Sequence, residues 1–258
     1  MHIAITRGVS PSIARCELTH LQRAPINFDV ACEQHRAYEA ALAACGVEVR
    51  SLPAEPSLPD SVFVEDTALV FDQCAVITRP GAASRQSETI AIAEALARYR
   101  KLFHVQSPGT IDGGDVLRVG SRVFVGRSTR TNRAGVEQLR AIVLPFEITV
   151  HEVEIRGCLH LKSAVTQVAD DTLLINPAWV DKAAFPNLKF IEVDPSESSA
   201  ANALLLNNAL LYQPRFPKTL NRLAAAGLRV VPVDLSELGK AEGALTCCSL
   251  LFASDTRP

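Results

Sequence analysis

The stretch at residues 116–125 is Val116-Leu117-Arg118-Val119-Gly120-Ser121-Arg122-Val123-Phe124-Val125, two apolar runs on either side of a turn pair. Valine and phenylalanine are favoured in strands, and a two-residue turn of this kind joins the strands of a tight hairpin. Three other parts of the chain share this plan of two short apolar runs around a polar turn pair. They are 67–71 with 74–78, 164–168 with 172–175, and 203–206 with 209–212. The sequence therefore predicts four β-hairpins.

Helix-like segments lie between the hairpins. Residues 87–100 carry Ile90, Ala93, Leu96 and Ala97 at the spacing of one helix face. Similar segments at 30–45, 133–144 and 218–226 stop at Gly46, Pro145 and Gly227. Each segment is followed by a strand-like run, at 47–52, 102–105, 148–153 and 228–231.

A hairpin–helix–strand unit therefore recurs, with a period of about forty to fifty residues. Residues 2–6 and 249–253 are lone strands, and pairing them would make a fifth hairpin and close a ring. We expect closure to remove exposed sheet edges. No Pro/Ser-rich linker divides the chain, since 53–59 has the composition of a loop. We predict one α/β domain of five pseudo-repeats over residues 1–258.

Reactive side chains stand at one position of this repeat. Glu65 and Asp66 precede the first hairpin, the glycine turn at 112–115 precedes the second, His160 the third and Cys247 the closing one. Equivalent positions of a ring face the same end of its axis, so we expect these residues to converge on a central pocket. A thiol, an imidazole and several carboxylates are the groups of a cysteine-nucleophile enzyme that acts on a cationic substrate.

Composition narrows the class of protein. Hydrophobic residues make up 48% and charged residues 21%, so a sizeable core is expected and disorder is not. The net charge is −2 without a basic run, which argues against nucleic acid as a partner. No apolar stretch is long enough for a membrane span, and the start is too quickly polar for a signal peptide. Seven irregularly spaced cysteines favour free thiols in a reducing, cytoplasmic environment.

Several segments together resemble those of dimethylarginine dimethylaminohydrolases, members of the guanidino-group-modifying or pentein superfamily. They are Pro59-Asp60-Ser61-Val62-Phe63-Val64-Glu65-Asp66, Asp112-Gly113-Gly114-Asp115-Val116, Arg130-Thr131-Asn132, Leu159-His160-Leu161-Lys162 and Leu245-Thr246-Cys247. The resemblance runs through most of the chain in the family's order. It implies a five-fold pseudosymmetric α/β propeller, in agreement with the repeat count, and hydrolysis of methylated arginine to citrulline and an amine without a cofactor or resident metal.

The resemblance also implies roles for the reactive residues. Cys247 would be the nucleophile and His160 the general acid and base. Asp112 would orient His160, although related enzymes often carry glutamate there, so the shorter acid needs a closer approach. Cys248 would follow Cys247 on a strand, point to the other face and pack in the core. A soft divalent metal would inhibit by binding Cys247 with His160.

Further residues are expected to bind the substrate. Asp66 is the better partner for the guanidinium, since Asp66 and Glu65 face opposite sides of an extended segment. The resemblance places Asp60, Glu65 and Ala241 in the site as well. It also implies that Arg85 and Arg130 hold the α-carboxylate and that the backbone of Leu18 covers the site as part of a lid at 13–21. The segment Lys240-Ala241-Glu242-Gly243 departs from the family, which more often has an apolar residue followed by aspartate.

Other functions stay open from the sequence. The chain could act on unmethylated arginine or another guanidino compound, although arginine deiminases usually carry an extra helical domain. Amidinotransferases, which are also longer, pass the adduct to an amine. A binding protein without turnover is a third alternative, against which the set of Cys247, His160, Asp112 and Asp66 argues. We expect a small-molecule substrate, no nucleic-acid or membrane partner, and a homodimer.

Overall fold

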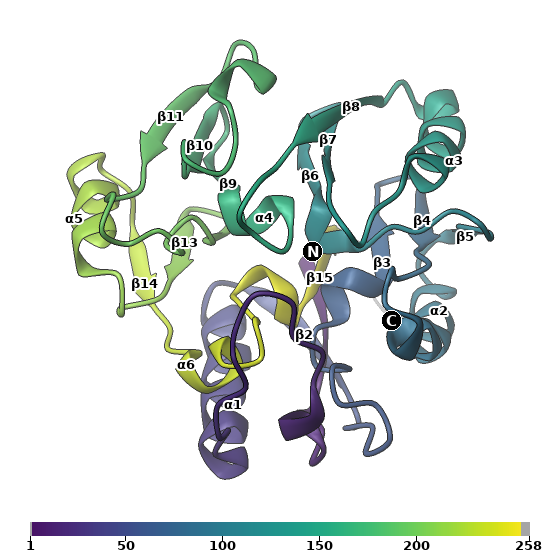
Figure 1. The fold of residues 1–258 in the computed structure, drawn as a ribbon, viewed down its shortest axis with the longest axis horizontal. Helices are drawn as coiled ribbons and strands as arrows, with labels where there is room; N and C mark the ends of the chain where they lie inside the picture. Colours follow the sequence, from purple (N-terminus) through teal and green to yellow (C-terminus); the bar gives the residue numbers. More distant parts are fainter. Residues whose placement is uncertain (1, 254–258) are drawn as a thin grey trace.

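The computed structural model describes residues 2–253, which form five three-stranded sheets around a central axis (Figure 1). In each sheet an antiparallel pair is extended by a third strand parallel to the middle one. The α/β fold of five repeats is as predicted. The sheets are β15(Leu250–Ala253)-β1(His2–Arg7)-β2(Val47–Leu52), β3(Ala68–Val70)-β4(Cys74–Ile77)-β5(Lys101–His104), β6(Val116–Val119)-β7(Arg122–Arg127)-β8(Thr149–Glu154), β9(Val165–Ala169)-β10(Thr172–Ile175)-β11(Lys189–Glu192) and β12(Leu204–Leu206)-β13(Ala209–Tyr212)-β14(Val230–Pro232).

Helices supply the crossovers that parallel strands require. α1 (Phe28–Ala44), α2 (Thr89–Leu96), α3 (Arg133–Val143) and α5 (Pro217–Ala225) each connect a middle strand to its parallel partner. The crossover between β10 and β11 has only the 3₁₀ turn Lys182–Ala184, and β11 itself was not predicted. Asn27 and Asn132 cap α1 and α3: each side chain accepts the backbone N–H of the third residue of its helix.

The two ends of the described chain pair as predicted. β1 and β15 are antiparallel, with His2 opposite Ala253 and Ile5 opposite Leu250. The expectation that closure would remove sheet edges is wrong, because hydrogen bonds stop at three strands and the five sheets remain separate. The ring is held by side chains packed between neighbouring sheets rather than by a continuous ladder.

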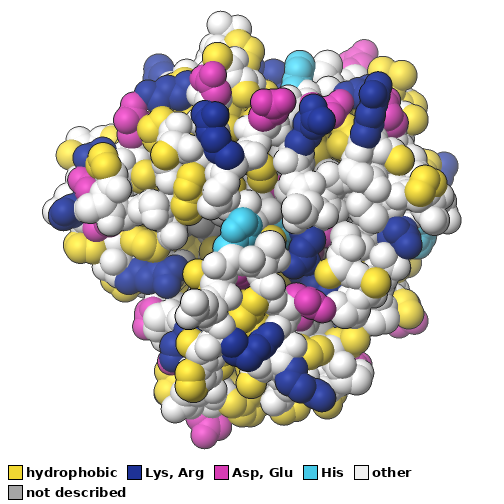
Figure 2. Space-filling view, in the orientation of Figure 1, with side chains coloured by type: hydrophobic (Ala, Val, Ile, Leu, Met, Phe, Trp, Pro, Cys, Tyr) yellow, Lys and Arg dark blue, Asp and Glu magenta, His cyan; other side chains and the backbone are white. Residues whose placement is uncertain are grey.

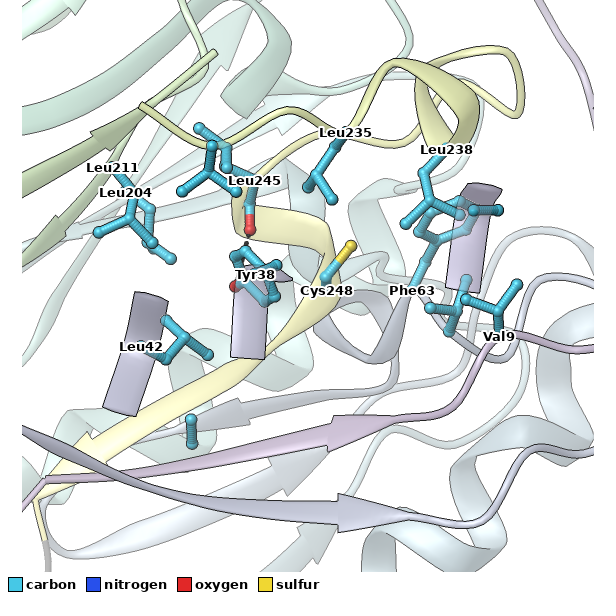
Figure 3. Packing of buried hydrophobic residues seen from close by; sticks show 14 of the residues in the cluster. Val9, Tyr38, Leu42, Phe63, Leu204, Leu211, Leu235, Leu238, Leu245 and Cys248 are labelled. Atoms are coloured by element: carbon cyan, nitrogen blue, oxygen red, sulfur yellow. Dashed lines mark hydrogen bonds between the residues drawn. The ribbon is translucent and has the colours of Figure 1, made fainter. Parts of the chain in front are cut away.

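Five clusters of buried apolar side chains fill the spaces between and beneath the sheets. In the cluster of Figure 3, Tyr38 of α1 lies fully buried and donates its hydroxyl to the carbonyl of Leu245, 2.9 Å away. This bond joins α1 to the segment that leads to Cys247. Over residues 2–253, no helix has the length and apolar character needed to cross a membrane.

Short helical turns precede four of the strands that line the axis. Val64–Thr67 leads into β3, Gly113–Asp115 into β6, α4 (Leu161–Ala164) into β9, and Thr246–Cys248 precedes β15. Near the axis, the turn Val64–Thr67 packs against both Gly113–Asp115 and Thr246–Cys248, and Gly113–Asp115 also packs against α4. The repeat position predicted to carry the chemistry is therefore one structural position, which brings segments far apart in sequence together.

Candidate active site

A cavity of about 20 Å³ lies where these turns meet. Figure 2 shows a histidine and basic side chains near the middle of this face of the molecule. By volume the cavity has room for little more than one water, so in this state the site is closed over. It is lined by Glu17, Asp60, Phe63, Asp66, Arg85, Arg130, Leu159, His160, Ala241, Glu242, Gly243 and Cys247.

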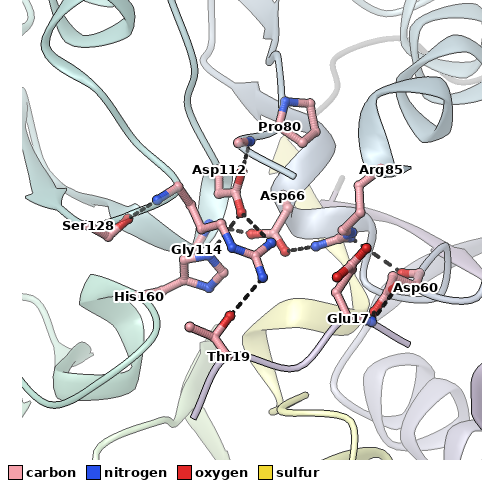
Figure 4. Close-up of polar contacts among 12 residues, drawn as sticks. Glu17, Thr19, Asp60, Asp66, Pro80, Arg85, Asp112, Gly114, Ser128 and His160 are labelled. Atoms are coloured by element: carbon pink, nitrogen blue, oxygen red, sulfur yellow. Dashed lines mark hydrogen bonds and ion pairs between the residues drawn. The ribbon is translucent and has the colours of Figure 1, made fainter. Parts of the chain in front are cut away.

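The imidazole of His160 is held by buried carboxylates (Figure 4). Its Nε2 lies 3.0 Å from Oδ2 of Asp112, so the shorter acid does make the predicted approach. Asp66 lies on the other side of Gly114 and accepts the Gly114 N–H at 2.9 Å. A Cβ on Gly114 would stand 2.6 Å from Nδ1 of His160 and 3.0 Å from Oδ1 of Asp66. Only glycine therefore lets this turn pass between the two side chains.

The electrostatics of this cluster favour an imidazolium. Burial by itself lowers the pKa of His160, but the charge of Asp66, the hydrogen bond to Asp112 and the charge of Asp115 together raise it to about 9. The pKa of Asp66 is about 2, because His160 and Arg85 outweigh the effect of burial. His160 is therefore protonated at neutral pH and can donate a proton.

Cys247 and Cys248 point in different directions, as predicted, but not for the predicted reason. Both lie in the 3₁₀ turn Thr246–Cys248, not in a strand, and successive residues of such a turn are about 120° apart. Cys247 lines the cavity. Cys248 is fully buried among apolar side chains, and its sulfur lies 3.6 Å from the carbonyl oxygen of Ala244 (Figure 3).

The thiol of Cys247 is a poor nucleophile in this state. Burial and the nearby carboxylates of Glu65 and Asp66 hold its pKa well above the ordinary range. The same carboxylates that keep the thiol protonated would attract a cation into the cavity. A bound guanidinium would offset their effect and lower the pKa of Cys247.

Glu65 does not line this cavity, contrary to the expectation. Its carboxylate accepts from Nζ of Lys162 at 2.6 Å and from the Thr246 hydroxyl at 2.8 Å. With Lys162 and Thr246 it lines a separate cavity of about 290 Å³ that also includes side chains of β3, β12 and β15. Glu65 and Asp66 do face opposite sides, and Glu65 acts on Cys247 only through its charge.

Arg85 has contacts that differ from its expected role. Its side chain is buried and pairs with Oδ2 of Asp66 at 2.6 Å and with Glu88 at 2.8 Å. It also donates to the carbonyl of Phe63. A buried guanidinium requires carboxylate partners, and for Arg85 these partners are Asp66 and Glu88. Arg85 therefore lines the cavity but holds Asp66 in place.

Arg130 is the more available arginine. Its Nη2 donates to the Thr19 hydroxyl at 2.9 Å, and its Nη1 lies 3.8 Å from Asp112 (Figure 4). Asp60 lies across the cavity and accepts the backbone N–H of Glu17 at 3.0 Å. A cation and an anion that both line the cavity can hold the carboxylate and ammonium of an amino acid.

The loop at 16–21 borders the cavity through Glu17 and is held by a residue that the sequence did not identify. The carboxylate of Glu242 accepts the backbone N–H groups of Thr19, His20 and Leu21, at 3.0, 2.6 and 2.7 Å. Leu18 is half-buried and packs against the core cluster that contains Cys248. Glu242 itself has a left-handed backbone, with φ of 60°. The one sequence signal was that this segment departs from the family pattern.

Asp66, Asp112 and His160 also form a potential set of metal ligands. One ligand atom from each lies within 4.8 Å of the others. All three groups already have partners. Asp112 contacts His160 and accepts the Gly81 N–H, and Asp66 accepts from Arg85. A metal would have to compete with these contacts.

The comparisons with known proteins agree with this geometry. A family model described as arginine deiminase matches residues 51–209. A Streptomyces coelicolor protein named N(G),N(G)-dimethylarginine dimethylaminohydrolase is 44% identical over 96% of this chain and 95% of its own length. A Pseudomonas aeruginosa protein of the same name is 39% identical over 88% of this chain and 90% of its own.

Solved structures match in fold as well. A cysteine-to-serine mutant of the Pseudomonas aeruginosa enzyme, in complex with citrulline, has a TM-score of 0.93 and 36% identity, over 97% of this chain and 98% of that one. The N-terminal domain of ArgZ, a cyanobacterial arginine dihydrolase bound to its substrate, has a TM-score of 0.83 at 19% identity and shows the fold alone. The chain belongs to the family of the arginine deiminases and dimethylarginine dimethylaminohydrolases.

Proposed function

We propose that the chain hydrolyses Nω-methylated arginine to citrulline and methylamine or dimethylamine. The observation that carries the proposal is that one small cavity is lined by the thiol of Cys247, the imidazolium of His160 and the carboxylate of Asp66. The relatives named dimethylarginine dimethylaminohydrolase support the methylated substrate. The test is citrulline formation from asymmetric dimethylarginine, monomethylarginine and arginine. Preference for arginine would refute the substrate assignment, and no citrulline from any of them would refute the activity.

In the first step the guanidinium enters beside Asp66, and Cys247 loses its proton to solvent, because His160 is already protonated, its pKa being raised to about 9. The sulfur then attacks the guanidinium carbon and forms a C–S bond. His160 donates its proton to the methylated nitrogen, the C–N bond breaks, and the amine leaves. A thiouronium adduct on Cys247 and a neutral imidazole remain.

In the second step water attacks the adduct carbon and His160 takes the water's proton. The C–S bond breaks, the thiolate leaves, and citrulline is released after loss of a proton. Asp112 keeps the imidazole oriented in both steps, while Arg130 and Asp60 hold the amino-acid end of the substrate. Each of these residues acts at an atom that lines or borders the cavity.

Replacing Asp112 with asparagine should shift the pH dependence of the reaction. The Asp112 hydrogen bond raises the pKa of His160, so in Asp112→Asn that pKa falls from about 9. The alkaline limb of the rate should move to lower pH, and kcat/KM near neutral pH should fall by at least about 10-fold. A pH–rate profile measures this, with Asp181→Asn, a carboxylate far from the cavity that caps a 3₁₀ turn, as the control. An unmoved alkaline limb would contradict the role of Asp112.

Substrate entry requires the loop at 16–21 to open, since the closed cavity is too small for an arginine. In Glu242→Gln the three backbone N–H groups lose their carboxylate acceptor, and the closed loop is weakened by about 1–2 kcal/mol. KM should rise roughly 5- to 30-fold, with a smaller change in kcat. The control is Glu237→Gln, which alters a carboxylate that accepts the N–H of Asn27 outside the loop. Equal KM values for the two variants would show that Glu242 does not hold the loop.

The homodimer predicted from the sequence remains a proposal. Sedimentation equilibrium over a range of concentrations measures it directly.

A further inference from the structure

A second hollow, of about 210 Å³, lies beside the loop at 16–21 and is distinct from the catalytic cavity. His20 and Leu21 of the loop line it, together with Trp179, which follows β10, and Arg215, which follows β13. Drug-sized ligands occupy pockets of about 300–1,000 Å³, so this hollow suits a smaller molecule. It shares Leu159, Glu242 and Gly243 with the catalytic cavity, but none of the residues assigned to the reaction chemistry.

Gln213 is the first sign that this hollow has a ligand. Its side chain lines the hollow and is 1% exposed. Within residues 2–253, its Oε1 has no hydrogen-bond partner. Leaving a buried amide unpaired costs about 1–3 kcal/mol, and native proteins pair nearly all such groups. A ligand that reorients or bonds this amide would recover that free energy.

Arg215 is the second sign. Among residues 2–253 its guanidinium has no ion pair and no hydrogen bond; its Cζ lies over the Phe216 ring, 4.7 Å from the centroid, and a Cβ on Gly239 would lie 2.9 Å from Nη1. Arg215 is an exposed residue at the edge of the hollow; partial burial of its guanidinium lowers its pKa, and the charge of Asp234 partly offsets this effect. Carboxylates are the groups that guanidinium binds most directionally.

Other unused donors border the same hollow. The indole N–H of Trp179 and the hydroxyl of Ser163 make no hydrogen bond to another described residue. Glu242 is the one acid among the lining residues, and its oxygens already accept the loop's N–H groups. Among the lining residues the charges of Arg215 and Glu242 cancel, and the charge of Asp234 also reaches Arg215. A dianion such as phosphate is disfavoured there, whereas a zwitterion is matched in charge.

We propose that this hollow is a second binding site, for a small zwitterionic amino acid. Its carboxylate would bind Arg215 with help from the Trp179 N–H, and its ammonium would bind Oε1 of Gln213 after this buried amide turns toward the hollow. Because His20 and Leu21 form a wall of the hollow only when the loop is closed, a bound amino acid shifts the loop toward the closed state. This coupling rests on the proposed function, whereas the binding site itself does not.

Binding is tested on the full chain with the catalytic cavity blocked. The protein is labelled with 2-chloroacetamidine, single modification is confirmed by mass spectrometry, and L-alanine, L-serine and L-glutamine are titrated with calorimetry or ligand-detected NMR. We expect saturable binding of at least one amino acid, with alaninamide and inorganic phosphate binding much more weakly. Binding to unlabelled but not labelled protein, no saturable binding, or binding of phosphate alone would overturn the proposal. If the label does not attach, Cys247→Ser protein saturated with citrulline replaces it.

Two variants connect the binding to the named residues. Arg215→Met should weaken binding by at least about 10-fold, and Arg215→Lys should restore part of it. Gln213→Leu should weaken binding without lowering the melting temperature, because it removes an amide that has no internal partner. Binding that is unchanged in Arg215→Met would overturn the assignment. The failure of citrulline formation in the earlier assay would not affect this result, because no turnover is measured.

Discussion

Cys247→Ser is expected to lose citrulline formation by at least about 1,000-fold. A serine hydroxyl is far harder to deprotonate than a thiol, and the nearby carboxylates of Glu65 and Asp66 oppose its ionisation further. Substrate binding should persist, because Asp66, Arg130 and Asp60 are unchanged. Discontinuous citrulline assays give the rate, and calorimetry with dimethylarginine gives the affinity.

The matched control is Cys248→Ser, one residue away in the same turn. Cys248 is buried in the core beside the Ala244 carbonyl, so the new hydroxyl has one acceptor but replaces an apolar contact. We expect a loss of stability of about 1–3 kcal/mol and retention of most of the activity in the folded protein. If Cys248→Ser abolishes turnover and Cys247→Ser does not, the assignment of the nucleophile is wrong.

His160→Gln is expected to slow hydrolysis of dimethylarginine by about 100- to 10,000-fold. Glutamine can occupy the space beside Asp112 but cannot donate a proton to the leaving amine or accept one from water. A substrate with a thiol leaving group, S-methyl-L-thiocitrulline, depends less on that proton. With it, the variant should form the adduct on Cys247 and fail to hydrolyse it.

Intact-protein mass spectrometry measures this adduct over time. A solved structure of a histidine-to-glycine variant of a dimethylarginine dimethylaminohydrolase, as an adduct with S-methyl-L-thiocitrulline, makes the experiment practicable. His151→Gln is the control, since His151 is exposed and stacks on Phe124 at the outer side of a sheet. An adduct that disappears at the wild-type rate would mean that another group activates the water.

The repeat could be predicted because each of its parts is local. A hairpin depends on two short apolar runs and the turn between them, as at Gly120-Ser121, and a helix depends on spacing and a stop residue such as Gly46 or Gly227. The sequence analysis did not predict β11, because the crossover before it contains no helix of ordinary length that would mark a strand after it. The limit of three strands per sheet was not predicted, because it depends on side-chain packing between neighbouring sheets, which no local sequence pattern indicates.

The sequence by itself determined which residue types stand at the repeat position, and symmetry then brought Cys247, His160, Asp112 and Asp66 near one axis. Only the tertiary structure decided how each charge is neutralised. Arg85 forms ion pairs with Asp66 and Glu88, and Glu65 forms one with Lys162, outside the catalytic cavity. Glu242 accepts hydrogen bonds from a loop more than 200 positions away in the chain. A buried charge is stable only beside its partner, and that partner is fixed by which distant segments the fold brings into contact.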